Sequence, residues 1–250
     1  MIRRALAALA AIASLSAAPL VAQDKPKEKP VKVVGDFGYV MASGNSEFST
    51  LNLGEKLTWK PAASKFSLDQ YAKYVYGETD GEESANQLGT GGRVNYAITS
   101  RLSAFAGLDF DKDRFAGIDQ RFSEPVGLSW LALDAPKNKF TIEGGANFVQ
   151  VTYTELQANG EFDEQYTSAR AAGTYKWLFS EKGYFQLFGE YLPALKEGIG
   201  YRANTEAAII APLAGIVALK VSYLMRYNSQ PPAGFEKTDR TFTTGIQVTP

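Results

Sequence analysis

The 250-residue sequence contains no cysteine and no histidine. Without cysteine the chain has no disulfide framework, no thiol nucleophile and no cysteine ligand for a metal. Without histidine it has no imidazole base, which excludes Ser-His-Asp and Cys-His chemistry and disfavours an integral hydrolase or protease. We therefore expect no enzymatic activity and no cofactor, and we assign no catalytic, cofactor-binding or metal-binding residue.

Neither sign of charge dominates the chain. It carries 26 basic and 27 acidic residues, for a formal net charge of −1. Such a mild balance offers no electrostatic reason to expect nucleic acid as a partner. Glycine, with 23 copies, and aromatic residues, at 12%, are the abundant types instead. Their abundance is typical of a single β-type domain with many turns.

Residues 1–22 have the three parts of a secretory signal peptide. A positive start at Arg3 and Arg4 is followed by an apolar stretch over residues 5–15 and by small residues up to Ala22. The alternative, a membrane anchor, would need roughly 20 strongly apolar residues. We expect cleavage after Ala22, then a flexible, proline-punctuated lead-in over residues 23–32 and one domain over residues 33–250.

Beyond residue 32, apolar side chains recur at every second position, which is the period of a strand with two different faces. Between Leu102 and Phe110, for example, apolar residues alternate with Ser103, Gly107 and Asp109. The pattern predicts about twelve strands. They cover residues 33–42, 48–59, 66–77, 87–98, 102–111, 120–133, 139–153, 165–179, 184–192, 201–211, 216–228 and 238–248.

The segments between these strands are expected to alternate in length. Short turns are predicted at residues 61–64, 99–101, 134–138, 180–183 and 212–215. Longer polar loops are predicted at residues 43–47, 78–86, 112–119, 154–164, 193–200 and 229–237. An even number of antiparallel strands with short turns on one side and long loops on the other is the layout of a bacterial outer-membrane barrel.

The alternation alone also fits a soluble barrel, in which the apolar face points inward. Two features favour a transmembrane barrel over a soluble one. The predicted strands run about 10 to 14 residues, whereas soluble strands average about 5 to 6. Aromatic residues such as Trp59, Trp130 and Trp177 lie near strand ends, as interfacial girdles do. The fold class expected is all-β: a closed, antiparallel transmembrane β-barrel of about twelve strands in a Gram-negative outer membrane.

In such a barrel the polar face of each strand lines the lumen, and here that face carries charges of both signs. They either line a narrow aqueous path or fill the interior with salt bridges, and both interpretations stay open. The predicted lumen-lining residues are Lys56, Asp69, Lys73, Arg93, Asp109, Arg121, Glu143, Arg170, Lys176, Arg202, Glu206, Lys220 and Arg226.

Three local features have ordinary explanations. The spacing of Asp109, Asp111 and Asp113 suggests a calcium-binding loop. A helix-loop-helix calcium site, however, needs Gly and Glu at the positions that Arg114 and Gln120 occupy. We therefore favour a network of charged side chains. The uncharged run over residues 207–219 is too short to span a membrane as a helix, and its Pro and Gly predict a hairpin. The acidic pairs at 82–83 and 163–164 are expected to be solvated loop groups.

Two segments and the last loop carry a family resemblance. Ser43-Gly44-Asn45-Ser46 follows the first predicted strand, the run from Asp111 to Arg121 is followed by Gly127, and residues 228–239 contain Pro232 and Gly234. In these motifs the sequence resembles the salt-induced outer membrane proteins, a family defined as a domain of unknown function, over nearly the whole chain from residue 33. The loop positions that carry it are Ser43, Gly44, Asn45, Asp111, Asp113, Arg114, Phe115, Gly117, Asp119 and Arg121.

The resemblance implies an outer-membrane barrel with expression linked to salt stress, and it supplies no catalytic residues. The chain departs from typical barrels by ending in Pro250 where such proteins usually end in an aromatic residue. We expect a narrow passive channel for small solutes or ions, and the alternative is a structural or adhesive barrel plugged by its own side chains. The expected partners are outer-membrane lipids, the barrel-assembly machinery and periplasmic chaperones.

Overall fold

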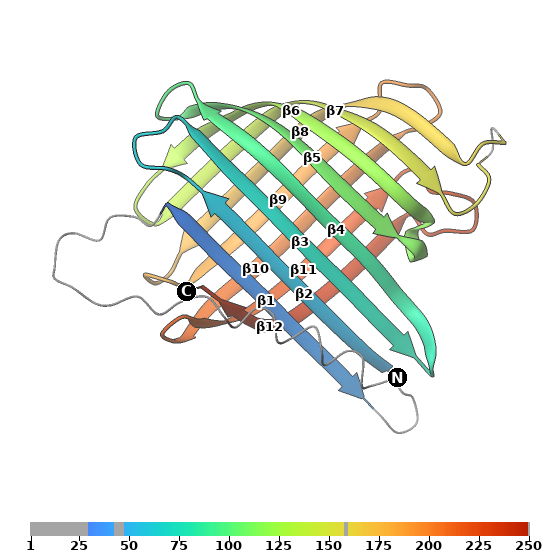
Figure 1. Ribbon diagram of the computed structural model, residues 1–250, viewed down its shortest axis with the longest axis horizontal. Coiled ribbons are helices and arrows are strands. Elements are labelled where there is room, and N and C mark those ends of the chain that lie inside the picture. The colour runs from blue at the N-terminus through green and yellow to red at the C-terminus, as the bar shows by residue number, and fades with distance from the viewer. Residues whose placement is uncertain (1–29, 43–47, 158–159, 250) are drawn as a thin grey trace.

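The computed structural model describes residues 30–42, 48–157 and 160–249, which form a closed antiparallel β-barrel (Figure 1). The strands on the near and far walls slope in opposite directions in this view, because barrel strands tilt relative to the barrel axis. Among the residues that the structure describes, no helix is both long and apolar enough to cross a membrane.

Twelve strands and one short 3-10 helix make up the described chain. The first six strands are β1 (Val31–Ala42), β2 (Phe48–Trp59), β3 (Phe66–Thr79), β4 (Glu82–Ala97), β5 (Leu102–Asp113) and β6 (Ile118–Asp134), with η3 (Arg114–Ala116) between the last two. The second six are β7 (Asn138–Tyr153), β8 (Asp163–Leu178), β9 (Tyr184–Pro193), β10 (Tyr201–Ala214), β11 (Val217–Asn228) and β12 (Thr238–Val248). The predicted number of strands is confirmed.

Each strand pairs with its neighbours in the sequence, and β12 closes the ring against β1. The closing seam is short: only Gly35–Phe37 of β1 pair with Ile246–Val248 of β12. On its other edge, β1 pairs with β2 along its whole length, from Val31 to Ala42. The start of β1 and the end of β12 lie at the rim that also carries the short turns (Figure 1).

The exterior of the barrel is apolar, and this decides between a soluble and a transmembrane barrel. Leu108 and Leu128, near the middle of their strands, are 52% and 50% exposed, whereas polar Ser168 and Asn147 are buried inside. A soluble barrel shows the opposite arrangement. Other exposed apolar side chains along the wall are Leu88, Val94, Val126, Phe148, Leu187, Ile209, Tyr223 and Phe242.

Aromatic side chains gather toward both rims. Trp59, Trp130 and Trp177 all lie near the short-turn ends of β2, β6 and β8, and each is exposed on the outer wall. Toward the opposite rim, Tyr201 stacks between Tyr191 and Tyr227, with ring centroids 5.3 and 5.5 Å apart. Two aromatic belts around an apolar wall are the arrangement of a barrel that spans a bilayer.

Several predicted boundaries need correction. Residues 82–86, predicted as part of a loop, belong to β4, because Asp80 and Gly81 adopt positive φ angles of 52° and 83° and close a tight hairpin turn. The predicted loop at 112–119 shrinks to η3 and Gly117. Of the predicted long loops that fall on described residues, long connections remain at 154–162, 194–200 and 229–237. The predicted hairpin within 207–219 is confirmed, but its turn lies at 215–216 and not at the predicted 212–215, because β10 continues to Ala214.

The lead-in predicted over residues 23–32 is two residues too long, since β1 already begins at Val31. The predicted signal peptide, most of the lead-in and the motif at Ser43, Gly44 and Asn45 lie outside the described residues.

Candidate functional site

Three neighbouring cavities lie in the described part of the barrel interior. The middle cavity has a volume of about 660 Å³, and the outer cavity, which lies among the long loops, has about 390 Å³. A third, of about 160 Å³, lies beside the seam between β1 and β12. The cavities meet at shared lining residues: Arg121, Leu192 and Arg202 line the middle and outer cavities, and Lys73, Glu206, Leu224 and Arg226 line the middle and seam cavities.

Strand tilt and side-chain alternation bring most of the predicted charged residues onto one surface. The middle cavity is lined by Lys56, Asp69, Lys73, Arg93, Asp109, Arg121, Glu143, Arg170, Arg202, Glu206 and Arg226. Lys220 lines the seam cavity. The Lys176 ammonium lies elsewhere, 3.6 Å from the centroid of the Tyr184 ring.

A network of ion pairs crosses the middle cavity. Arg93 donates two hydrogen bonds to Glu143, at 3.0 and 2.6 Å, and Arg170 donates to the same carboxylate at 2.8 Å. Arg170 also donates to Glu190 at 2.7 Å. The Phe105 ring lies beneath both guanidinium groups, 3.7 Å from that of Arg93. We call Arg93, Glu143, Arg170 and Glu190 the crossbar, because they join β4, β7, β8 and β9 and neutralise one another inside the lumen.

The three aspartates of β5 each have a partner of their own. Asp109 accepts a hydrogen bond from Tyr71 at 3.0 Å. Asp111 pairs with Arg121 at 3.4 Å, and Asp113 pairs with Arg226 at 3.3 Å. Across the part of the chain that the structure describes, no group of three or more acidic side chains is arranged to hold a metal ion. Arginines therefore compensate Asp111 and Asp113, whereas the hydrogen-bond partner of Asp109 is a neutral tyrosine hydroxyl.

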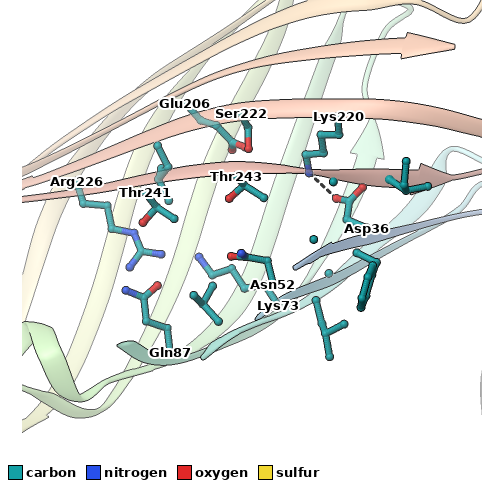
Figure 2. Close-up of a pocket in the computed structure, with 18 residues that line it drawn as sticks. Asp36, Asn52, Lys73, Gln87, Glu206, Lys220, Ser222, Arg226, Thr241 and Thr243 are labelled. Atoms are coloured by element: carbon teal, nitrogen blue, oxygen red, sulfur yellow. Dashed lines mark hydrogen bonds and ion pairs between the residues drawn. The ribbon is translucent and has the colours of Figure 1, made fainter. Parts of the chain in front are cut away.

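At the seam cavity, one carboxylate joins three strands (Figure 2). Asp36 of β1 forms an ion pair with Lys220 of β11, which Figure 2 shows as a dashed line. Asp36 also accepts a hydrogen bond from Gln247 of β12 at 3.0 Å. Figure 2 shows Thr241, Thr243 and Ser222 on one side of this cavity and Asn52, Lys73 and Gln87 on the other. Asp36 therefore holds the short β1–β12 junction closed from the inside.

The motif predicted from residue 111 to residue 121 is mostly regular structure. Asp111 and Asp113 lie on β5, Arg114 and Phe115 belong to η3, and Asp119 and Arg121 lie on β6. Asp113 caps η3 by accepting a hydrogen bond from the backbone of Ala116 at 3.2 Å. Lys112 pairs with Asp119 at 2.9 Å, and Arg114 lies 3.7 Å from Glu83.

Gly117 connects this motif to the last loop. It adopts a left-handed conformation, with φ of 72°, and a β-carbon there would lie 2.8 Å from the Phe235 ring. Only glycine combines this backbone with so close an approach. Two of the segments that carried the family resemblance, residues 111–121 and the last loop, therefore pack against each other at the loop rim of the barrel.

Sequence reasoning missed several polar groups of the lumen. Tyr71, Asn95, Glu190 and Asn204 line the middle cavity beside the predicted charges. Tyr71, Asn95 and Asn204 each lie two residues from a predicted lumen residue on their own strand, so the period of two could have identified them. Glu190 lies on β9, where no lumen residue was predicted, and pairs across the ladder with Asn204.

These features define the class: an antiparallel barrel of outer-membrane type with a charged, cavity-lined interior. Residues 35–249 match the family described as "Protein of unknown function, DUF481", and the chain belongs to this family. The resemblance to a family of unknown function is thereby confirmed, and the match carries no statement about salt.

Known proteins resemble the chain at two levels. An uncharacterized Escherichia coli K12 protein, YdiY, is 26% identical over 224 residues, covering 88% of this chain and 83% of YdiY. In structure, the barrel resembles the NanC porin, with a TM-score of 0.53 and 10% identity over 86% of this chain and 98% of NanC. It also resembles the COG4313 outer membrane channel of Pseudomonas putida F1, with a TM-score of 0.52 and 8% identity over 91% and 100%. At these identities the likeness shows the fold.

Proposed function

We propose that the protein is a non-enzymatic channel of the outer membrane for small hydrophilic solutes or ions. The observation that carries the proposal is that the middle cavity shares lining residues both with the seam cavity beside it and with the outer cavity among the loops. Polar and charged side chains line the middle cavity, so water and small polar solutes are its natural contents. The exposed apolar wall takes membrane lipid as its partner, and insertion requires the assembly machinery and periplasmic chaperones.

The narrowness of the path follows from the strand number and from the crossbar. Twelve strands enclose a lumen much narrower than that of porins with about 16 to 18 strands. The ion pairs of Arg93 and Arg170 with Glu143 then place side chains of both signs across it. We expect small conductance and passage of small solutes only.

The same crossbar favours the second candidate, a structural or adhesive barrel without transport. A fully compensated network of buried ion pairs can close a lumen as well as line it. In that case the connections at 154–162, 194–200 and 229–237 would make the functional contacts.

Single-channel recording in planar lipid bilayers separates the two. The purified, folded protein should produce small, uniform current steps in potassium chloride, and a boiled sample should produce none. Correctly inserted protein that stays electrically silent would refute the channel and support the structural barrel.

We also propose that expression of the protein is linked to salt stress, as the family resemblance suggested. The protein level should rise when the host grows at high sodium chloride and should not rise in sorbitol of equal osmolarity. An equal response to both would make the link osmotic, and a flat response to both would remove it.

A further inference from the structure

The passage from the outer to the middle cavity is bounded by two arginines. Arg121 of β6, Leu192 of β9 and Arg202 of β10 are the residues that line both cavities, and we call them the neck. A solute that moves along the lumen from the loop rim passes between these side chains.

The positive charge at the neck is poorly compensated, unlike that at the crossbar. Arg170 of the crossbar contacts two carboxylates, at 2.8 and 2.7 Å. Arg121 has one carboxylate partner, Asp111, at the longer distance of 3.4 Å. Arg202 forms no ion pair and no hydrogen bond with any residue that the structure describes. The strongest charge acting on it is that of Arg121, and the carboxylates of Glu190 and Asp111 act on it more weakly. The neck therefore concentrates positive charge.

Two buried nitrogens support this contrast. The Nε atoms of Arg121 and of Arg202 are both inaccessible, and neither has a hydrogen-bond partner among the described residues. An unpaired buried cation lowers stability, and a charge kept inside a membrane protein at such a cost usually serves a ligand or an ion.

The surroundings of the neck strengthen its field. Leu192 is only 4% exposed, and the apolar side chains of Ile118 and Val151 line the outer cavity beside it. Apolar walls lower the effective dielectric constant and raise the interaction of a bound charge with a guanidinium. Amide groups of Gln157, Asn228 and Gln230 on the same cavity add neutral donors for an approaching anion.

We propose that the neck is an anion-binding site, at which Arg121 and Arg202 select solutes that carry a carboxylate or a phosphate group. The planar guanidinium offers paired N–H donors that match the two oxygens of either group. The inference rests on the proposed channel and deepens it, because it assigns the substrate class to anionic solutes.

The test is the reversal potential of the channel in a potassium chloride gradient, compared between two single substitutions. Arg202→Gln removes the unpaired charge from the neck. Arg240→Gln, its matched control, removes the same group from an exposed position of β12 that lines none of the three cavities. We expect the anion-to-cation permeability ratio to fall about tenfold in Arg202→Gln and to stay unchanged in Arg240→Gln.

Binding to the detergent-folded protein separates the failure of this inference from the failure of the channel. Titration calorimetry with inorganic phosphate, and with acetate in a second arm, should give heat of binding for the wild type, less for Arg202→Lys, and none for Arg202→Gln. If all variants conduct and show equal permeability ratios, the proposed anion site at the neck is wrong, whereas the proposed channel function still holds. If the inserted protein carries no current but still binds phosphate, the proposed channel function is wrong and the proposed anion site holds.

Discussion

Arg93 of β4 and Glu143 of β7 form a two-pronged ion pair inside the lumen, with N–O distances of 3.0 and 2.6 Å. Their strands are separated in the wall by β5 and β6, so the pair bridges the interior. The guanidinium and the carboxylate thus narrow the middle cavity by their own bulk.

Removal of this ion pair should widen the path. In the double variant Arg93→Ser, Glu143→Ser the net charge is unchanged, and we expect single-channel conductance to rise by roughly twofold because the bulk is lost. The pair Lys139–Asp134, at 2.9 Å and exposed near the short turns, supplies a matched control. Its double serine variant should conduct as the wild type does. Equal conductance in all three proteins would show that the crossbar does not limit flow.

Loss of Glu143 alone should be harmful for a different reason. Glu143→Ala leaves Arg93 and Arg170 facing each other without their shared carboxylate. Removing one partner of a buried ion pair lowers the free energy of unfolding by about 3 to 5 kcal/mol. Because water in the lumen screens the remaining charges, we expect a loss of at most about 3 kcal/mol here. Denaturant unfolding in detergent measures it, and adding Arg93→Ala should recover part of the loss. A double variant as unstable as the sum of its parts would contradict the coupling.

The orientation of the strands can be tested with neighbouring residues at one depth. Leu128 faces outward and is 50% exposed, while Ser129 faces inward and pairs across the ladder with Glu143. Leu128→Arg should lower the unfolding free energy in lipid by roughly 2 to 4 kcal/mol, whereas Ser129→Arg should change it by less than about 1 kcal/mol. The reverse order would mean that the apolar face points inward.

We expect Asp36 to contribute more to the stability of the barrel than a comparable aspartate in a fully paired part of the wall. Asp36→Ala removes the link to Gln247 and Lys220 where only three residue pairs join β1 and β12. Asp69 likewise accepts two hydrogen bonds, from Thr58 and Asn95, but from strands paired along most of their length. On detergent gels, folded barrel should run faster than boiled protein.

We expect Asp36→Ala to lose the fast band at a temperature several degrees lower than Asp69→Ala does, because the wall around Asp69 holds without its side chain. Identical temperatures for the two variants would argue that the seam is no weaker than the rest of the ring.

The strand positions were predictable because a period of two with an apolar face is present in the sequence itself. The bounds of β2, Phe48–Trp59, and of β12, Thr238–Val248, agree to the residue. The largest error falls where β4 continues past the apolar belt. At residues 82–86 both faces are polar, so the sequence resembles a loop although the backbone remains paired.

The facing of the charges followed from the same period, but their partners did not. Arg93 and Glu143 are 50 residues apart, and their contact depends on the tilt and stagger of a closed ring. Nothing in the local sequence distinguishes Arg170, which has two carboxylate partners, from Arg202, which forms no ion pair with a described residue. Which arginines are neutralised is a property of the closed barrel alone.

The uninterrupted sequential order of the ring also makes the barrel a natural subject for circular permutation. Every strand pairs with its neighbour in the chain, and the start of β1 lies at the same rim as the end of β12 (Figure 1). A linker between those two ends, with new termini opened in the turn at 179–183, would preserve every strand pair and turn the present seam into an ordinary hairpin. The closing step would then fall to β8 and β9, which share eight residue pairs instead of three.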